Sequence, residues 1–251
     1  MLEEEILLKK RMVELAEKSY RNNQYLFSGF LSPAEFSVCV EALEKEHYRY
    51  EAFGGTEAAE RMMLRFGNPE DFGYEEAYPM SCLVVQPNLA KFADKLGHRD
   101  FLGSILNLGI ERSVIGDIII RDNVGYILCQ DKMAEFLAEN LTKIKHTYVK
   151  CSVTKEMPKA LEPELQVVQL SVSSERCDLV IAKLYHLSRS EALDLFREKK
   201  VCINGRIEES NSRSLKEGDV ISARGFGKFI YTGVKNINKK EKLKIEVQQY
   251  V

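Results

Sequence analysis

The stretch RCDLVIAKLYHLSRSEALDLFREKKVCINGRIEESNSRSLKEGDVISARG, residues 176–225, decides the fold of the C-terminal third of the chain. Ser188-Arg189-Ser190-Glu191 is a capping box and predicts that a helix begins there. A shorter helix, capped by Ser174 or Asp178, is expected to end just before it. Val201-Cys202-Ile203 predicts a strand, and Asn204-Gly205 predicts a tight turn into a return strand. The pattern therefore indicates two adjacent helices packed on a small antiparallel sheet.

Basic side chains are sorted along both predicted helices. In the second helix, Arg189, Arg197 and Lys200 fall on one flank, between an apolar arc and an acidic arc. In the first helix, Arg176 and Lys183 are seven residues apart and so nearly superimpose along the helix axis. Both helices thus present ordered cations, which is typical of a surface that meets a polyanion.

The same stretch resembles the S4-type RNA-binding domain. Arg-x-Asp, Ser-Arg-x-x-Ala, Val-x-Ile-Asn-Gly and Glu-Gly-Asp-x-Ile occur in the order that the domain has, and the resemblance covers about residues 171–228. It implies that Arg176, Arg189 and Arg206 are RNA-facing cations. Cys177 stands where the family often has Leu, which a buried Cys can replace because it behaves as a small hydrophobe.

We take a wider set of basic and turn residues in this region as candidates for RNA binding: Arg176, Lys183, Arg189, Arg197, Lys200, Asn204, Arg206, Arg213, Arg224 and Lys228. Asn204 fits a turn former better than a base reader. Arg176 could instead pair with Glu175, and the stem of Arg189 could simply cover apolar surface. The expected chemistry is phosphate recognition of structured RNA by planar guanidinium groups, with selectivity supplied by RNA shape.

Upstream, residues 79–160 predict a central module. Strands are expected at 80–85, 118–120, 125–130 and 147–153, and two helices are expected to be capped by Asp100 and Asp131. The order strand, helix, strand, strand, helix, strand suits a split α/β sandwich like that of RNA-recognition modules. It also suits many domains that bind no RNA.

The stretch HRDFLGSILNLGIERSVIGDIII, residues 98–120, resembles the hallmark segment of the bacterial YlmH family. Members of that family carry an unusual N-terminal region before a C-terminal S4-type domain. Together the two resemblances cover most of the chain, and they imply an RNA-binding protein.

Residues 1–78 predict an acidic, helix-rich module. Helices are expected over 1–23 and from the Ser32–Glu35 capping box to Glu46, followed by a short strand over 47–53 and a helix from Thr56 to about Gly67. This region has 9 basic and 16 acidic residues, against 11 and 11 in 79–170 and 16 and 11 in 171–251. Because its charge should repel RNA, a protein partner is at least as expected there.

A trailing β-hairpin is expected after the helix pair, with strands over 229–234 and 242–247 and a turn through 236–238. The fold class is therefore α+β, with three predicted modules at 1–78, 79–160 and 168–251. The basic hairpin edge could guard against aggregation or extend the RNA surface, and the sequence does not separate these readings.

The remaining composition limits the classes of protein. The six cysteines lie more than 20 residues apart with no Cys-x-x-Cys pair, which argues against a zinc knuckle or a disulfide framework and favours reduced thiols. No metal or cofactor is expected. No apolar run approaches a membrane span and the N-terminus is acidic, so we expect a cytoplasmic protein without a membrane partner.

Three functions fit these patterns. The first is a non-catalytic accessory factor that binds rRNA or tRNA, most plausibly on the large ribosomal subunit, with translation quality control of obstructed subunits carrying peptidyl-tRNA as an extension. The second is an RNA-modifying enzyme of the pseudouridine synthase kind, with His98, Asp100 or Asp117 in its site. The third is an interaction protein of the division apparatus. No catalytic motif is present, which favours the first.

Overall fold

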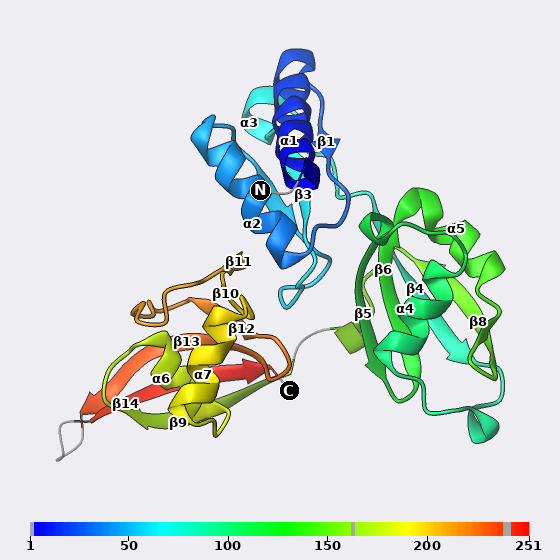
Figure 1. Cartoon of the computed structure of the whole chain (residues 1–251). Coiled ribbons are helices and arrows are strands. Elements are labelled where there is room, and N and C mark those ends of the chain that lie inside the picture. The colour runs from blue at the N-terminus through cyan, green and yellow to red at the C-terminus, as the bar shows by residue number, and fades with distance from the viewer. Residues whose placement is uncertain (1–2, 162–163, 238–241, 251) are drawn as a thin grey trace. The chain divides into compact units, whose positions relative to one another are not determined.

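The computed structural model describes residues 3–161, 164–237 and 242–250 (Figure 1). The chain forms two compact units, 1–162 and 163–251. Both combine helices with antiparallel sheets, so the predicted α+β class is confirmed. The further division of the first unit into modules at 1–78 and 79–160 stays a prediction.

The first unit begins with two long helices that pack side by side (Figure 1). They are α1 (Glu3–Asn22) and α2 (Pro33–Lys45), and the Ser32 capping box at the start of α2 is confirmed. The remaining elements here are β1 (Leu26–Phe27), β2 (Glu51–Phe53), β3 (Met63–Phe66) and the short α3 (Pro69–Phe72), with the strands in the order β1-β3-β2. Met12, Cys39, Leu43 and Phe66 are buried between the helices and this small sheet.

The helix predicted from Thr56 to Gly67 is wrong, because that segment ends in β3. All four residues of β3 are buried, and the strand pairs with β1 on one side and β2 on the other. Burial of Met63, Leu64 and Phe66 in a strand that pairs on both sides outweighed the local cap and glycine signals. The strand expected over 47–53 is restricted to Glu51–Phe53.

The central part of the first unit has the predicted order of elements. The strands are β4 (Met80–Pro87), β5 (Ile115–Arg121), β6 (Val124–Gln130), β7 (Lys143–Ile144) and β8 (Thr147–Thr154), and the helices are α4 (His98–Leu106) and α5 (Asp131–Asn140). The strands form one antiparallel sheet in the order β5-β6-β4-β8-β7. Three short 3-10 helices, η1 (Ala90–Phe92), η2 (Arg112–Val114) and η3 (Lys159–Leu161), lie in the connections.

Two helix caps differ from the prediction. The N-cap of α4 is Gly97, and Asp100 sits in the first turn, where its carboxylate accepts from the Gly97 N–H at 2.8 Å. The N-cap of α5 is Gln130, and Asp131 accepts from the Ser81 hydroxyl at 2.5 Å. Both carboxylates still favour the helix start through the helix dipole, but from inside the helix.

Both faces of the central sheet are covered over part of their length. Helices α4 and α5 cover one face (Figure 1), and Met63 and Phe30 of the N-terminal part pack with Cys82 and Leu128 on the other. Gly55 permits the close approach, because a Cβ built there would lie 2.7 Å from Leu128 Cδ1 and its φ is +92°. The buried Arg61 guanidinium ties the layers by donating to the carbonyls of Phe30 and Ile115.

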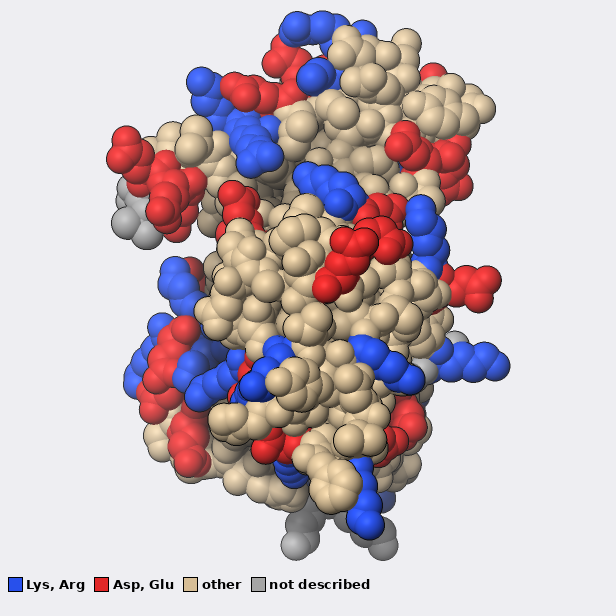
Figure 2. Space-filling model, turned by 90° about the vertical axis from the view of Figure 1, so that its right-hand side faces the viewer, with Lys and Arg blue, Asp and Glu red and all other residues tan. Residues whose placement is uncertain are grey.

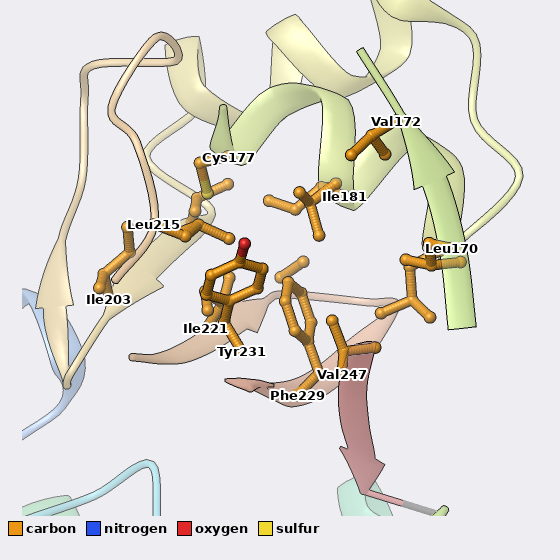
Figure 3. Close-up of a cluster of buried hydrophobic side chains, with 14 of the residues drawn as sticks. Leu170, Val172, Cys177, Ile181, Ile203, Leu215, Ile221, Phe229, Tyr231 and Val247 are labelled. Carbon is orange, nitrogen blue, oxygen red and sulfur yellow. The ribbon is translucent and has the colours of Figure 1, made fainter. Parts of the chain in front are cut away.

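The second unit is one antiparallel sheet with two helices on one face (Figure 1). The strands run in the order β11-β10-β12-β13-β14-β9, and their bounds are β9 (Leu165–Val172), β10 (Val201–Ile203), β11 (Arg206–Ile207), β12 (Val220–Ala223), β13 (Gly227–Ile237) and β14 (Leu243–Tyr250). The helices are α6 (Cys177–Leu184) and α7 (Arg189–Arg197). Figure 3 shows Phe229 and Tyr231 of β13 reaching from the sheet toward Ile181 of α6.

The predicted helix pair and hairpin are present, with changed boundaries. The Ser188 capping box begins α7 as expected, whereas α6 starts after Arg176 rather than at a Ser174 or Asp178 cap. The hairpin strands are longer than predicted, and part of the turn expected at 236–238 lies outside the described residues.

Candidate RNA-binding surface

The helix pair of the second unit carries two candidate cations that are exposed to solvent. A left-handed residue, His186 with φ of 56°, turns the chain between α6 and α7. Ala192, Leu195 and Phe196 anchor α7 in the core. Lys183 in the last turn of α6 and Arg189 at the first position of α7 are exposed. The capped start of α7 thus fixes where Arg189 leaves the helix.

The β12–β13 hairpin brings a third cation to the end of the sheet nearest the α6 C-terminus. Arg224 is exposed, and its backbone N–H donates to the Lys200 carbonyl at 2.9 Å. Phe226 lies at the hairpin tip with its ring centroid 5.8 Å from that of Tyr185, and it is 44% exposed. Gly225 allows the tight turn with φ of +92°. An exposed aromatic ring and an exposed cation therefore share the tip of this hairpin.

Tyr185, beneath that tip, is partly buried and its hydroxyl oxygen is fully buried, and this desolvation raises the pKa of its phenol well above the ordinary value. Its hydroxyl has no hydrogen-bond partner among the described residues. The ring therefore serves as an apolar support under Phe226 and remains a neutral phenol at physiological pH.

Arg176, at the other end of α6, is held by a buried carboxylate. Its Nε and one terminal nitrogen donate to the two oxygens of Asp178 at 3.0 and 2.7 Å, and the Asp178 side chain is 1% exposed. These hydrogen bonds raise the pKa of Arg176. Glu175, the alternative partner considered from the sequence, instead accepts from the Tyr231 hydroxyl at 2.5 Å. Arg176 therefore has a structural partner in addition to any RNA role.

Three further candidates form ion pairs near the surface. Arg213 pairs with Glu208 at 2.7 Å, Arg197 with Asp194 at 2.8 Å and Lys200 with Glu198 at 2.5 Å. Exposed pairs of this kind contribute about 0–1 kcal/mol, so an RNA phosphate can compete for the cation.

The last three candidates differ in how their side chains are used. Asn204 has a left-handed backbone with φ of 51°. Its Nδ2 donates to Asp219 and its Oδ1 accepts from the Val220 N–H, both at 2.9 Å, so both polar atoms of the side-chain amide stabilise the turn. Arg206 is exposed on β11, and the Lys228 Nζ lies 5.5 Å from the centroid of the Tyr250 ring. The geometry of Asn204 favours its reading as a turn former.

Sequence reasoning missed two features of this surface. Phe226 was not among the candidate residues chosen from the sequence, and its exposure follows from the hairpin geometry. Lys199 was not chosen, and it pairs with Glu209 at 2.9 Å. The flanking glycines of Phe226 are the one signal that could have marked the tip of a hairpin.

Comparisons with known proteins agree with this architecture. The family model "Putative RNA-binding domain in YlmH" matches residues 75–157, and the S4 domain model matches residues 175–221. The chain therefore carries a YlmH-type putative RNA-binding domain followed by an S4 domain. These two matched domains coincide with the central sheet and with the helix pair described above.

Two individual proteins are similar to this chain. The "Ribosome-associated protein quality control protein P2" of Bacillus subtilis (strain 168) is 26% identical over 247 residues, which cover 94% of this chain and 90% of that protein. A solved structure, "Cell division protein ylmH from Streptococcus pneumoniae", is 18% identical with a TM-score of 0.49 and covers 61% of this chain and 93% of its own.

The residues of the catalytic alternative are engaged in structural contacts. The pKa of Asp100 is lowered by its hydrogen bond from Lys145 and then by that from Gly97. Asp117 accepts from the backbone N–H groups of Glu60 and Arg61 at 2.7 and 3.2 Å. Burial, followed by the charge of Arg112, lowers the pKa of His98. Asp100 thus supports the start of helix α4, and Asp117 supports the contact between the layers.

The charge and cysteine patterns have simple structural counterparts. Figure 2 shows one face of the molecule, where blue and red side chains are interspersed around uncharged surface. All six cysteines are free thiols, and five of them are buried. Within the described ranges, no cluster of His, Cys, Asp or Glu could hold a metal ion, and no helix is long and apolar enough to cross a bilayer.

Proposed function

We propose that this protein is a non-catalytic accessory factor that binds structured rRNA or tRNA, on the large ribosomal subunit. The observation that carries the proposal is the set Lys183, Arg189 and Arg224, three exposed cations on the S4 domain whose side chains have no ion-pair partner in the described part of the chain. The printed name of the Bacillus subtilis relative, which describes a ribosome-associated protein, supports the same assignment.

The mechanism follows from the way these cations are held. Arg189 and Arg224 can each offer two N–H groups to phosphate oxygens without first breaking an internal ion pair. Arg176, Arg197, Lys200 and Arg213 would join by exchanging carboxylates for phosphates. Side chains cannot read the deep major groove of A-form RNA, so the spacing of cations would select RNA by shape. Binding should weaken steeply with salt because counterions are released.

A role in translation quality control of obstructed subunits carrying peptidyl-tRNA extends the proposal, and the name of the same relative supports it. The site of action would then be the cytoplasm. The N-terminal region, with 9 basic and 16 acidic residues in 1–78, is suited to a protein partner rather than to RNA.

The test is sedimentation of the full chain in lysate through sucrose gradients across a salt series. We compare wild type with Arg189→Glu/Arg224→Glu, and with the matched control Arg11→Glu/Lys18→Glu, which makes the same charge change on exposed positions of α1. Wild type and control should travel with the large subunit at low salt, while the S4 variant stays at the top. The proposal fails if wild type does not co-sediment, or if both double variants behave alike.

The variant Arg189→Glu/Arg224→Glu also tests the alternative that the protein acts through an interaction with the division apparatus. Arg176→Glu is left out because it would place two carboxylates together in the Asp178 site and disturb folding. If Arg189→Glu/Arg224→Glu fully replaces the wild type in vivo, RNA binding by this surface is not the function, and an interaction role takes its place.

A further inference from the structure

A second cluster of unusual side chains lies in the first unit, at the end of the central sheet formed by β7 and the start of β8. Phe92 and Tyr148 are 79% and 63% exposed. Such large aromatic rings are normally buried or engaged, and a cluster of them on a surface marks an interaction site. We call this cluster, with Lys91, Lys143 and Lys150, the β7–β8 patch.

Hydrogen bonds join the loop that carries Phe92 to the strand that carries Tyr148. The loop after β4, which contains η1, returns to the beginning of β8 (Figure 1). The Asn88 N–H donates to the Tyr148 carbonyl at 2.9 Å, and the Asp94 N–H donates to the Thr147 hydroxyl at 2.9 Å. Phe92 therefore lies on a short loop whose two ends are hydrogen-bonded to Tyr148 and Thr147.

Each ring is accompanied by an ammonium group. The Lys143 Nζ lies 5.1 Å from the centroid of the Tyr148 ring, and the Lys91 Nζ lies 5.9 Å from that of Phe92. Lys150 is exposed and is two residues from Tyr148 on the same strand, so it projects from the same face of the sheet. The patch thus alternates π-faces with positive charges.

The charge of the patch is only partly cancelled locally. Lys91, Lys143 and Lys150, together with the neighbouring exposed Lys95, have no ion-pair partner within the described ranges. Of the nearby acids, Asp100 pairs with Lys145 at 2.8 Å, whereas Asp94 accepts from the neutral Thr147 hydroxyl at 3.2 Å and offsets one of the four lysine charges. Lysine is depleted at protein–protein contacts, so these charges favour a polyanion over a protein as the occupant.

Burial of the middle of the central sheet's second face explains why the patch lies at the β7–β8 edge. Met80, Cys82 and Leu128 are buried beneath the N-terminal part of the unit, so the middle of the face cannot stack bases. Farther along the same face, Gln86 is exposed opposite Lys150. The open remainder of the face therefore leads to Tyr148.

We infer that the β7–β8 patch binds unpaired RNA, with bases stacking on Tyr148 and Phe92 and phosphates lying against the lysines. Stacking on aromatic rings requires exposed π-faces of the bases, which single strands offer and duplexes do not. This inference rests on the proposed RNA-binding function, but it concerns a different RNA form and a site in the other unit from the S4 cations.

The absence of tryptophan from the sequence permits a direct test. Tyr148→Trp gives the full chain a single tryptophan in the patch, and Tyr20→Trp gives one at a 68% exposed position on α1. A 12-nucleotide oligouridylate should quench the first saturably and leave the second unchanged, and a fully paired RNA hairpin should quench neither. Equal responses at the two positions, or no response at Tyr148→Trp, overturn the inference.

Affinity measurements by fluorescence anisotropy of labelled oligouridylate supply the second readout. Tyr148→Ala should weaken binding by about tenfold and Tyr148→Phe should restore it, because the π-face is what matters. Lys143→Ala should lower the slope of log K against log salt by about 0.7, while the control Lys132→Ala on α5 leaves it unchanged. A Tyr148→Ala variant that binds as tightly as wild type contradicts the proposal.

One combination distinguishes this site from the S4 surface. In Tyr148→Trp carrying Arg189→Glu/Arg224→Glu, quenching by oligouridylate should persist even though co-sedimentation with the large subunit is lost. If quenching is also lost, single-strand binding belongs to the S4 surface and the patch has no independent role. If wild type co-sediments but Tyr148→Trp never responds, the patch is rejected and the proposed function stands.

Discussion

The sheets of the two units differ in how many of their faces are buried. In β4, Met80 to Leu83 and Val85 are buried, so side chains on both faces are covered. In β14, buried Ile245 and Val247 alternate with less buried Lys244 and Glu246. A near-continuous apolar strand belongs to a layer covered on both sides, and an alternating strand to a layer with one wet face.

This difference decides where each unit can meet RNA. The first unit uses part of its second sheet face for internal packing, and the proposed β7–β8 patch lies on the part that remains open. The second unit keeps that face in solvent, with Val167 56% exposed, and carries its unpaired cations on helices and a hairpin. Both units pack helices on a sheet, but the first unit covers part of both sheet faces and the second unit leaves one sheet face in solvent.

The largest expected effect is on stability, for a substitution on the covered face of the central sheet. Leu128→Ala should destabilise the first unit by about 2–5 kcal/mol, because it leaves a cavity under the N-terminal part. Val167→Ala, on the open face of the second unit, should change stability by less than about 0.5 kcal/mol. Urea unfolding followed by circular dichroism measures both, and similar costs for the two variants would show that the faces do not differ.

A smaller effect on stability should distinguish Arg176 from Arg189, the two arginines at the helix starts that the S4 resemblance marks as RNA-facing. Arg176→Ala leaves the buried Asp178 carboxylate without its cation, at a cost of about 1–3 kcal/mol. Arg189→Ala removes an exposed side chain and should leave stability nearly unchanged while weakening RNA binding. Thermal unfolding and co-sedimentation are measured on the same samples. Equal stability of the two variants would remove the structural role of Arg176.

The smallest effect compares the two capping boxes. Ser32→Ala and Ser188→Ala should each cost about 1 kcal/mol at pH 7, since each removes an N-cap hydrogen bond. Hydrogen bonds from the side chain and then the backbone of Ser188 lower the pKa of Glu191 below its ordinary value of 4.5. The Glu191 contribution is therefore present above that pH and is lost as the pH falls through the lowered value.

Denaturation at pH 7 and pH 3 checks this sign. The cost of Ser188→Ala should be smaller at pH 3 than at pH 7, because the fraction of Glu191 that is protonated, and so no longer completes the capping box, rises as the pH falls. Glu191→Gln, which keeps the shape of the side chain without its charge, is the control and should reduce the pH dependence. An unchanged cost of Ser188→Ala at the two pH values contradicts this account of Glu191.

Local sequence signals predicted the elements whose hydrogen bonds close within a few residues. Both capping boxes, the Asn204-Gly205 turn and the order of strands and helices in 79–160 are present as expected. The helix from Thr56 failed because β3 gains more from pairing with two distant strands than from a local cap. Caps at Asp100 and Asp131 were off by a few residues, since a carboxylate can stabilise a helix start from several positions.

The sequence by itself determined the fold class, the S4 resemblance and the set of cations that could face RNA, because these depend on short-range pattern and on composition. Only the tertiary structure decided which cations are already paired, as Arg176 is with Asp178, and which remain open, as Arg189 does. It alone revealed that β4 is covered on both faces and that the loop carrying Phe92 is hydrogen-bonded to the start of β8, which carries Tyr148. These properties join residues far apart in the chain, and no local pattern encodes which distant partner fills a given space.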